Sequence, residues 1–94
     1  LGASEIAFTQ NNVLAVITNT DENTIALTSL TREMLLATID VGVSPSDVVI
    51  TPDAKTAYVS NADSNTVSII DLGQKTRVAE FPVSKDPQKL LLRA

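Results

Sequence analysis

Short apolar and β-branched segments alternate with polar turns along the whole chain. Asp47–Thr51 is such a segment, and Pro52-Asp53, a pair typical of turns, ends it. Because no long window carries helical spacing instead, the pattern indicates strands throughout. The predicted strands are Glu5–Thr9, Val13–Thr18, Thr24–Leu30, Leu35–Val41, Asp47–Thr51, Thr56–Ser60, Thr66–Asp71, Arg77–Val83 and Lys89–Leu92.

A repeat with a period of 42 residues organises these strands. Shifting the chain by this amount, without gaps, aligns Asn19 with Asn61 and Leu30 with Leu72. Four short strands per roughly 40–50 residues, repeated in tandem, are typical of propeller blades. The apolar run Val48–Ile50 agrees with this, since a blade lies between neighbours and both of its faces are buried.

We therefore expect an all-β fold of β-propeller blades. Two four-stranded antiparallel sheets are predicted at residues 1–42 and 43–84, and the first strand of a third blade at residues 85–94. Arg77–Val83 is the fourth strand of the second sheet, with Pro82 near its exposed end, where a missing N–H is tolerated.

The second period resembles the YVTN-type β-propeller repeat, a seven-bladed-like family named for a Tyr-Val-Thr-Asn stretch. The resemblance rests on Ser44–Asp53, on Tyr58-Val59-Ser60-Asn61 at the signature, and on Asn65–Asp71. The first period is a weaker copy, with Val16-Ile17-Thr18-Asn19 at the signature. The resemblance implies that Ile6–Phe8, Val48–Ile50 and Leu90–Leu92 lie on innermost strands and that Arg77–Val83 is outermost. Proteins of this family are secreted, periplasmic or on the cell surface, so the resemblance implies an extracytoplasmic location.

The resemblance leaves two functions open. One is a non-catalytic scaffold or binding module. The other is part of a propeller enzyme, lactonase-like or haem- or quinone-dependent, whose catalytic residues lie on blades outside this chain. The first is preferred because the chain has no His or Cys and only three aromatic residues, Phe8, Tyr58 and Phe81.

Composition narrows the chemistry further. Without Cys there are no thiolate metal sites or cysteine nucleophiles, and without His the commonest general base is missing. The net charge of −4 argues against a nucleic-acid partner, and no apolar run approaches the length of a membrane span. We expect no catalytic residue, metal site or cofactor in this chain.

Acidic turns recur at the same place in both periods, at Asp21–Asn23 and Asp63–Asn65. Alternating oxygen ligands suggest calcium, but the Gly and the distant Glu of an EF-hand loop are missing. Hairpin turns whose side chains bond their own backbone are the preferred interpretation. Similarly, Asn19 and Asn61 are expected to satisfy backbone groups at strand ends, and Asp71 to accept N–H bonds from the turn that follows it.

The candidate binding surface consists of Ser46, Asp47, Lys85 and Lys89. These residues lie in equivalent links that join the outer strand of one blade to the inner strand of the next. In a closed propeller such links lie near the mouth of the channel, where ligands often bind.

Two blades do not close a propeller, which needs about four to eight. A blade face has an area of roughly 300 Å². Leaving such a face uncovered forgoes at most about 8 kcal/mol of hydrophobic stabilisation. The expected partners are therefore the remaining blades, from the same parent chain or from other copies. A protein partner is also left open. In a ring of identical chains Lys89–Leu92 would compete with Glu5–Thr9 for one place. This favours a piece of a longer propeller, although strand exchange between chains would restore a ring.

Overall fold

The computed structural model describes residues 5–83, and their strands form two four-stranded antiparallel sheets. In each sheet, strands that are neighbours in sequence pair side by side. The expected fold class, with its two sheets, is confirmed; the ninth strand expected at Lys89–Leu92 lies outside the described residues. The first sheet contains β1 (Ile6–Phe8), β2 (Leu14–Asn19), β3 (Thr24–Ser29) and β4 (Met34–Asp40), and the second contains β5 (Pro45–Ile50), β6 (Thr56–Asn61), β7 (Thr66–Asp71) and β8 (Thr76–Pro82).

The predicted strand boundaries differ from the observed ones by two residues at most. The largest difference is at β5, which begins at Pro45 because a bulge between Pro45 and Asp47 extends its pairing with β6. Proline is tolerated as a first strand residue, where its missing N–H removes no bond from the ladder. A short 3-10 helix, Thr20–Glu22, stands where a simple hairpin turn was expected.

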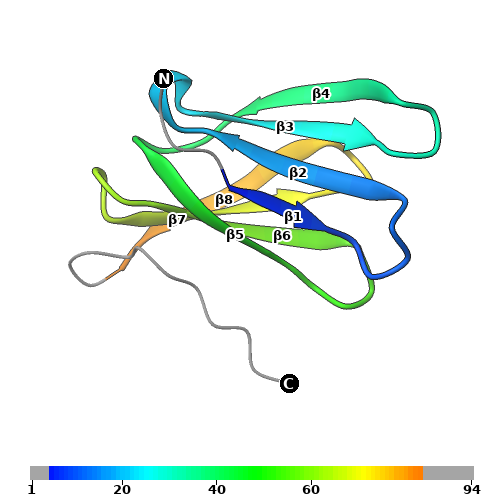
Figure 1. Ribbon diagram of the computed structural model, residues 1–94. Helices are drawn as coiled ribbons and strands as arrows, with labels where there is room; N and C mark the ends of the chain where they lie inside the picture. Colours follow the sequence, from blue (N-terminus) through cyan, green and yellow to red (C-terminus); the bar gives the residue numbers. More distant parts are fainter. Residues whose placement is uncertain (1–4, 84–94) are drawn as a thin grey trace.

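The two sheets stack face to face (Figure 1). Strand β5 packs against β1 and β2, whereas the outer strands β4 and β8 touch each other less. The sheets are thus closest along their inner strands and diverge toward their outer edges. Blades arranged around a central axis require this wedge shape.

The core lies between the sheets and uses alternate residues of the strands, apart from β8, whose residues are all exposed. We call the face of the first sheet that meets the second its back face, and the face of the second sheet that meets the first its front face. Because side chains alternate along a strand, the pairing register assigns each residue to one face. The buried back-face residues are Val16, Ile25, Leu27 and Ile39, and the buried front-face residues are Val48, Ala57, Val59 and Ile70.

The period of 42 residues is also visible in the backbone. Left-handed residues occur at equivalent turn positions in the two sheets: Asn12 and Ala54, Asn23 and Asn65, Glu33 and Lys75. The first β-hairpin of each sheet closes in the same way, with an Asn11 or Asp53 side-chain oxygen accepting the Val13 or Lys55 N–H. The polar residues of the repeat therefore specify the turns, and the apolar residues specify the two faces.

Candidate functional site

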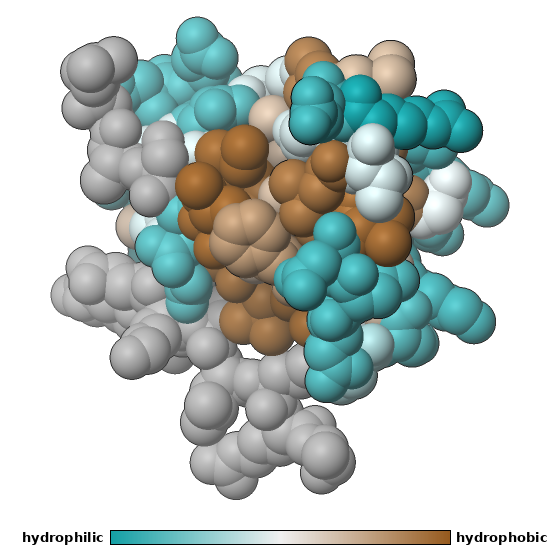
Figure 2. All heavy atoms as spheres, turned by 45° about the vertical axis from the view of Figure 1, so that its right-hand side comes forward, coloured by the Kyte–Doolittle hydropathy of each residue, from teal (hydrophilic) through white to brown (hydrophobic). Residues whose placement is uncertain are grey.

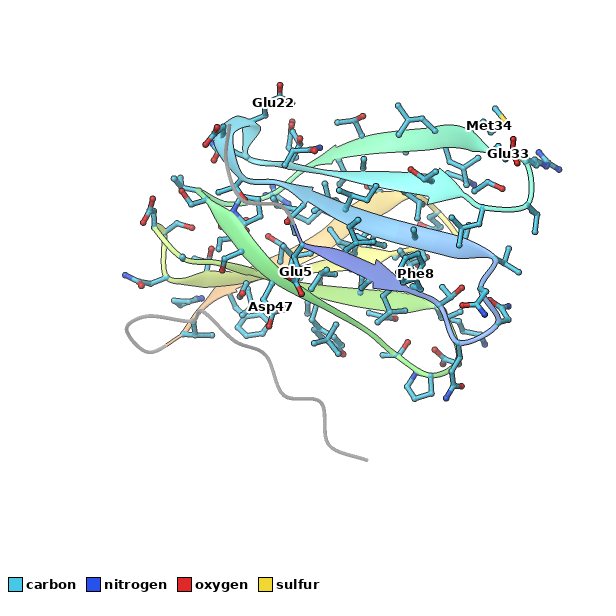
Figure 3. All side chains as sticks on the ribbon, in the orientation of Figure 1. Glu5, Phe8, Glu22, Glu33, Met34 and Asp47 are labelled. Carbon is cyan, nitrogen blue, oxygen red and sulfur yellow. The ribbon has the colours of Figure 1, made fainter. Side chains whose placement is uncertain are left out.

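Both outer surfaces of the two-sheet stack carry apolar side chains. On the front face of the first sheet, Ile6 and Phe8 are 50% and 56% exposed, and Phe8 projects from β1 in Figure 3. On the back face of the second sheet, Phe81 is 41% exposed and Tyr58 and Ile69 are only partly buried. Figure 2 shows one continuous apolar area bordered by hydrophilic side chains. We call the exposed front face of the first sheet the open front face, and the exposed back face of the second sheet the open back face.

Each open face is equivalent, by the 42-residue repeat, to a face that is buried between the two sheets. Ile6 is equivalent to Val48, which is only 6% exposed because the first sheet covers it. In the same way Phe81 is equivalent to Ile39, which the second sheet covers. The same position of the repeat is therefore buried in one sheet and exposed in the other, so the open faces have the pattern of surfaces that another blade covers.

The predicted binding surface is only partly within the described residues. Ser46 lies at the β5 bulge, with its hydroxyl 3.3 Å from that of Ser60. Asp47 accepts a hydrogen bond from the Val48 N–H at 3.0 Å. Lys85 and Lys89 lie outside the described residues. The structure therefore places Ser46 and Asp47 at the start of an inner strand, and the joint surface with the two lysines remains a prediction.

Residues 41–44 link β4 to β5 and so join the two sheets; we call this segment the link. The turn between the second and third strands of each sheet holds the link in place. The Ser44 N–H donates to the Asn23 side chain at 2.9 Å, and the Ser44 hydroxyl donates to Asp63 at 2.6 Å. The Val43 N–H donates to the Ser64 hydroxyl at 3.1 Å. The acidic turns were expected to bond only within their own hairpins, and their bonds to residues 43 and 44 are a tertiary feature. Only the tertiary structure brings residues 19–21 positions apart into contact here.

Asn61, the last residue of the signature stretch, is fully buried beside this link. Its side-chain amide donates to the hydroxyls of Thr66 and Ser68, at 3.1 and 3.0 Å. The equivalent Asn19 donates to Thr24 at 3.1 Å. Hydroxyl partners on the adjacent strand thus replace the backbone groups that were expected. The Oδ1 atom of Asn61 is buried without a partner.

Gly42 allows the link to pass close to Asn61. A Cβ atom at this position would lie 2.7 Å from the Asn61 Cγ atom and 2.6 Å from the Ser64 hydroxyl oxygen. Such approaches are too close for any side chain. The glycine therefore fixes how tightly the two sheets join at this end.

The expected turn role of Asp71 is confirmed, since its carboxylate accepts the Gln74 N–H at 3.0 Å. Asp53 plays a similar role at the tip of the β5–β6 hairpin. Hydrogen bonds from the Thr51 hydroxyl and the Lys55 N–H lower its pKa below the ordinary value of 3.8. Both carboxylates act as structural acceptors in turns.

A groove of about 320 Å³ opens where the outer strands β4 and β8 diverge, and Arg77 lines it. The Arg77 guanidinium pairs with Glu80 at 2.8 Å, and Glu80 also accepts from Ser68. The groove is polar; its other lining residues are Thr38, Ile39, Asp40, Lys75 and Thr76.

Within residues 5–83 no three His, Cys, Asp or Glu residues gather closely enough to hold a metal ion. The same residues contain no helix long and apolar enough to cross a membrane.

Solved structures of propeller-type proteins are similar to this fold. Hydrazine synthase from Kuenenia stuttgartiensis matches with a TM-score of 0.83 and 28% identity, over 88% of this chain and 24% of its own. AztD from Citrobacter koseri matches with a TM-score of 0.71 and 18% identity, over 86% of this chain and 21% of its own. The two sheets are therefore blades of a β-propeller.

A functionally unknown protein from Desulfotomaculum acetoxidans also matches, with a TM-score of 0.76 and 22% identity, over 87% of this chain and 29% of its own. The chain thus spans about a quarter of the length of these three proteins. No family model and no curated protein matches the chain.

Proposed function

We propose that this chain is part of an extracytoplasmic YVTN-type β-propeller, in which it serves as a non-catalytic scaffold or binding module. The observation that carries the proposal is the equivalence of open and buried faces. Ile6 and Phe81 are exposed, while the equivalent Val48 and Ile39 are buried between the sheets. Surfaces with this pattern serve to dock further blades, and docked blades form the rigid support on which propellers carry their ligand sites.

The YVTN assignment is supported by the role of the signature residues. Tyr58-Val59-Ser60-Asn61 forms most of β6, with Val59 in the core and Asn61 tying β6 to β7 through two hydroxyls. Because each blade needs a core residue and a bond between its second and third strands at this place, such a stretch would recur in every blade. The extracytoplasmic location is supported by the family resemblance alone.

Thiol labelling tests the docking part of the proposal. The chain has no Cys, so Phe8→Cys or Phe81→Cys introduces a single reactive thiol on an open face. In the native propeller we expect both thiols to react with a maleimide at least tenfold more slowly than in the isolated chain. Val43→Cys, in the link, is the control and should react similarly in both. Equal rates for the face thiols in both proteins would contradict docking.

Cell fractionation tests the location. An antibody raised against the chain should detect a protein larger than 10.0 kDa in the periplasmic, surface or secreted fraction. Recovery with a cytoplasmic marker enzyme would refute the extracytoplasmic assignment.

A second candidate function is part of a propeller enzyme whose catalytic residues lie on other blades. The likeness to a protein named hydrazine synthase, at 28% identity, favours it. The absorption spectrum of the native protein separates the two candidates. A haem or quinone band that persists through purification supports the enzyme, and its absence together with a lack of lactonase activity supports the scaffold.

A further inference from the structure

We infer that the open front face of one copy of this chain binds the open back face of a second copy, head to tail. This inference concerns the 94-residue chain itself and goes beyond the proposed role in a parent propeller. It starts from the interface already present inside the chain, where the back face of the first sheet covers the front face of the second. The open faces continue the same stack in both directions.

The apolar contacts of the internal interface have counterparts on the open faces. Inside the chain, Val59 on the front face and Leu27 on the back face are fully buried. Their equivalents are Ile17 on the open front face and Ile69 on the open back face, both partly buried. Each pair keeps an aliphatic side chain of similar size. A second copy placed as the second sheet is placed on the first would therefore bury apolar surface against apolar surface.

The outer edge gives the strongest argument. In the internal interface this edge is the polar groove, where Arg77 on the front face lies opposite Ile39 on the back face. The equivalent residues on the open faces are Leu35, 56% exposed, and Phe81, 41% exposed. Both are apolar. The outer edge of a contact between two copies would therefore be lined by apolar side chains and closed, whereas the same edge inside the chain is an open polar groove. Large apolar side chains at these two exposed positions match the requirement of an interface.

A head-to-tail contact is heterologous, because the two copies use different surfaces. Several side chains on the open faces are larger than their buried equivalents; Phe81, for example, stands where the first sheet has the buried Ile39. The contact between copies therefore has to repack relative to the internal one, which weakens it. We expect reversible association in the micromolar range.

Two single variants and their mixture test the inference by sedimentation velocity and native mass spectrometry. Leu35→Glu blocks only the front face and Phe81→Glu only the back face. Wild-type chain at about 100 μM should associate and should dissociate to the 10.0 kDa monomer on hundredfold dilution. Each variant alone should remain monomeric. Their equimolar mixture should form a dimer that contains one copy of each, since one intact front face and one intact back face remain.

Val43→Glu, at an exposed apolar residue of the link, is the matched control and should associate like the wild type. Circular dichroism and thermal unfolding of every variant establish that it is folded; both face residues are exposed in the monomer, so we expect unchanged spectra. A wild-type chain that is monomeric at 100 μM overturns the inference. So does association that survives either substitution, or a mixture of the variants that stays monomeric. None of these results bears on the location of the parent protein. The thiol labelling above uses isolated chain diluted until it is monomeric, so that self-association does not cover the face thiols.

Discussion

Leu27 and Ile69 occupy the same position in the two blades, yet their substitution by alanine should have very different effects on stability. Leu27 is fully buried against the second sheet, whereas Ile69 lies partly buried on the open back face. Both substitutions remove three carbon atoms from a strand of the same type. The comparison therefore isolates the contribution of a covering blade.

The expected magnitudes follow from burial. Three buried carbons at about 0.8 kcal/mol each contribute about 2.4 kcal/mol of transfer free energy. Leu27→Ala also leaves a cavity between the sheets, which raises the expected loss in unfolding free energy to about 3–4 kcal/mol. Ile69→Ala opens no closed cavity, and its side chain already contacts solvent. We expect a loss of about 1 kcal/mol.

Urea denaturation followed by circular dichroism measures both losses. The protein should be diluted to a concentration at which sedimentation velocity finds only monomer, because a bound second copy would cover Ile69. An unchanged denaturant slope establishes that the change lies in stability and not in the mode of unfolding. Losses equal within about 0.5 kcal/mol in monomeric protein, or a larger loss for Ile69→Ala, would refute the distinction between covered and open faces.

Three further substitutions test the link and the turns. Gly42→Ala should lower the unfolding free energy by about 1–3 kcal/mol because its Cβ collides with the side chains of Asn61 and Ser64. Gly73→Ala, whose nearest contact is 3.4 Å away, is the control and should change the unfolding free energy by less than about 0.5 kcal/mol. Equal effects of the two substitutions would contradict the close approach at Gly42. Asn23→Gly keeps the left-handed backbone but loses the bond to the link, and should cost about 0.5–1.5 kcal/mol in denaturant unfolding, whereas Asn12→Gly in an exposed hairpin should be near neutral. Asp53 has a lower pKa in the folded than in the unfolded chain, so its contribution to stability is present above pH 3.8 and is lost as the pH falls through the folded pKa. Asp53→Asn should therefore flatten the acid limb of the stability profile between pH 2 and 5, and an unchanged limb would show that its turn bonds do not persist in solution.

Much of the local structure could be predicted from the amino-acid order, because turns and strands are decided by neighbours in sequence. The period of 42 residues, the polar hairpin residues and the apolar runs predicted eight strands of the described part within two residues of their observed ends. The turn role of Asp71 was also predictable, since its acceptor oxygen and the donating Gln74 are only three positions apart. Less of the candidate binding surface could be predicted. Of its four residues only Ser46 and Asp47 lie within residues 5–83, and the spacing of the four predicted neither their hydrogen-bond partners nor a ligand.

Tertiary structure decided which apolar residues are covered. The sequence marks Ile6 and Val48, or Phe81 and Ile39, as the same position of one repeat, and local physics treats them alike. Only the stacking of the two sheets buries one member of each pair and exposes the other. The bonds of Asn23 and Asp63 to Ser44 have the same origin, because they join segments that the chain brings together only when the blades dock. The sequence by itself thus determined the blade, and the tertiary structure determined its open faces, since burial depends on what lies beyond the strand.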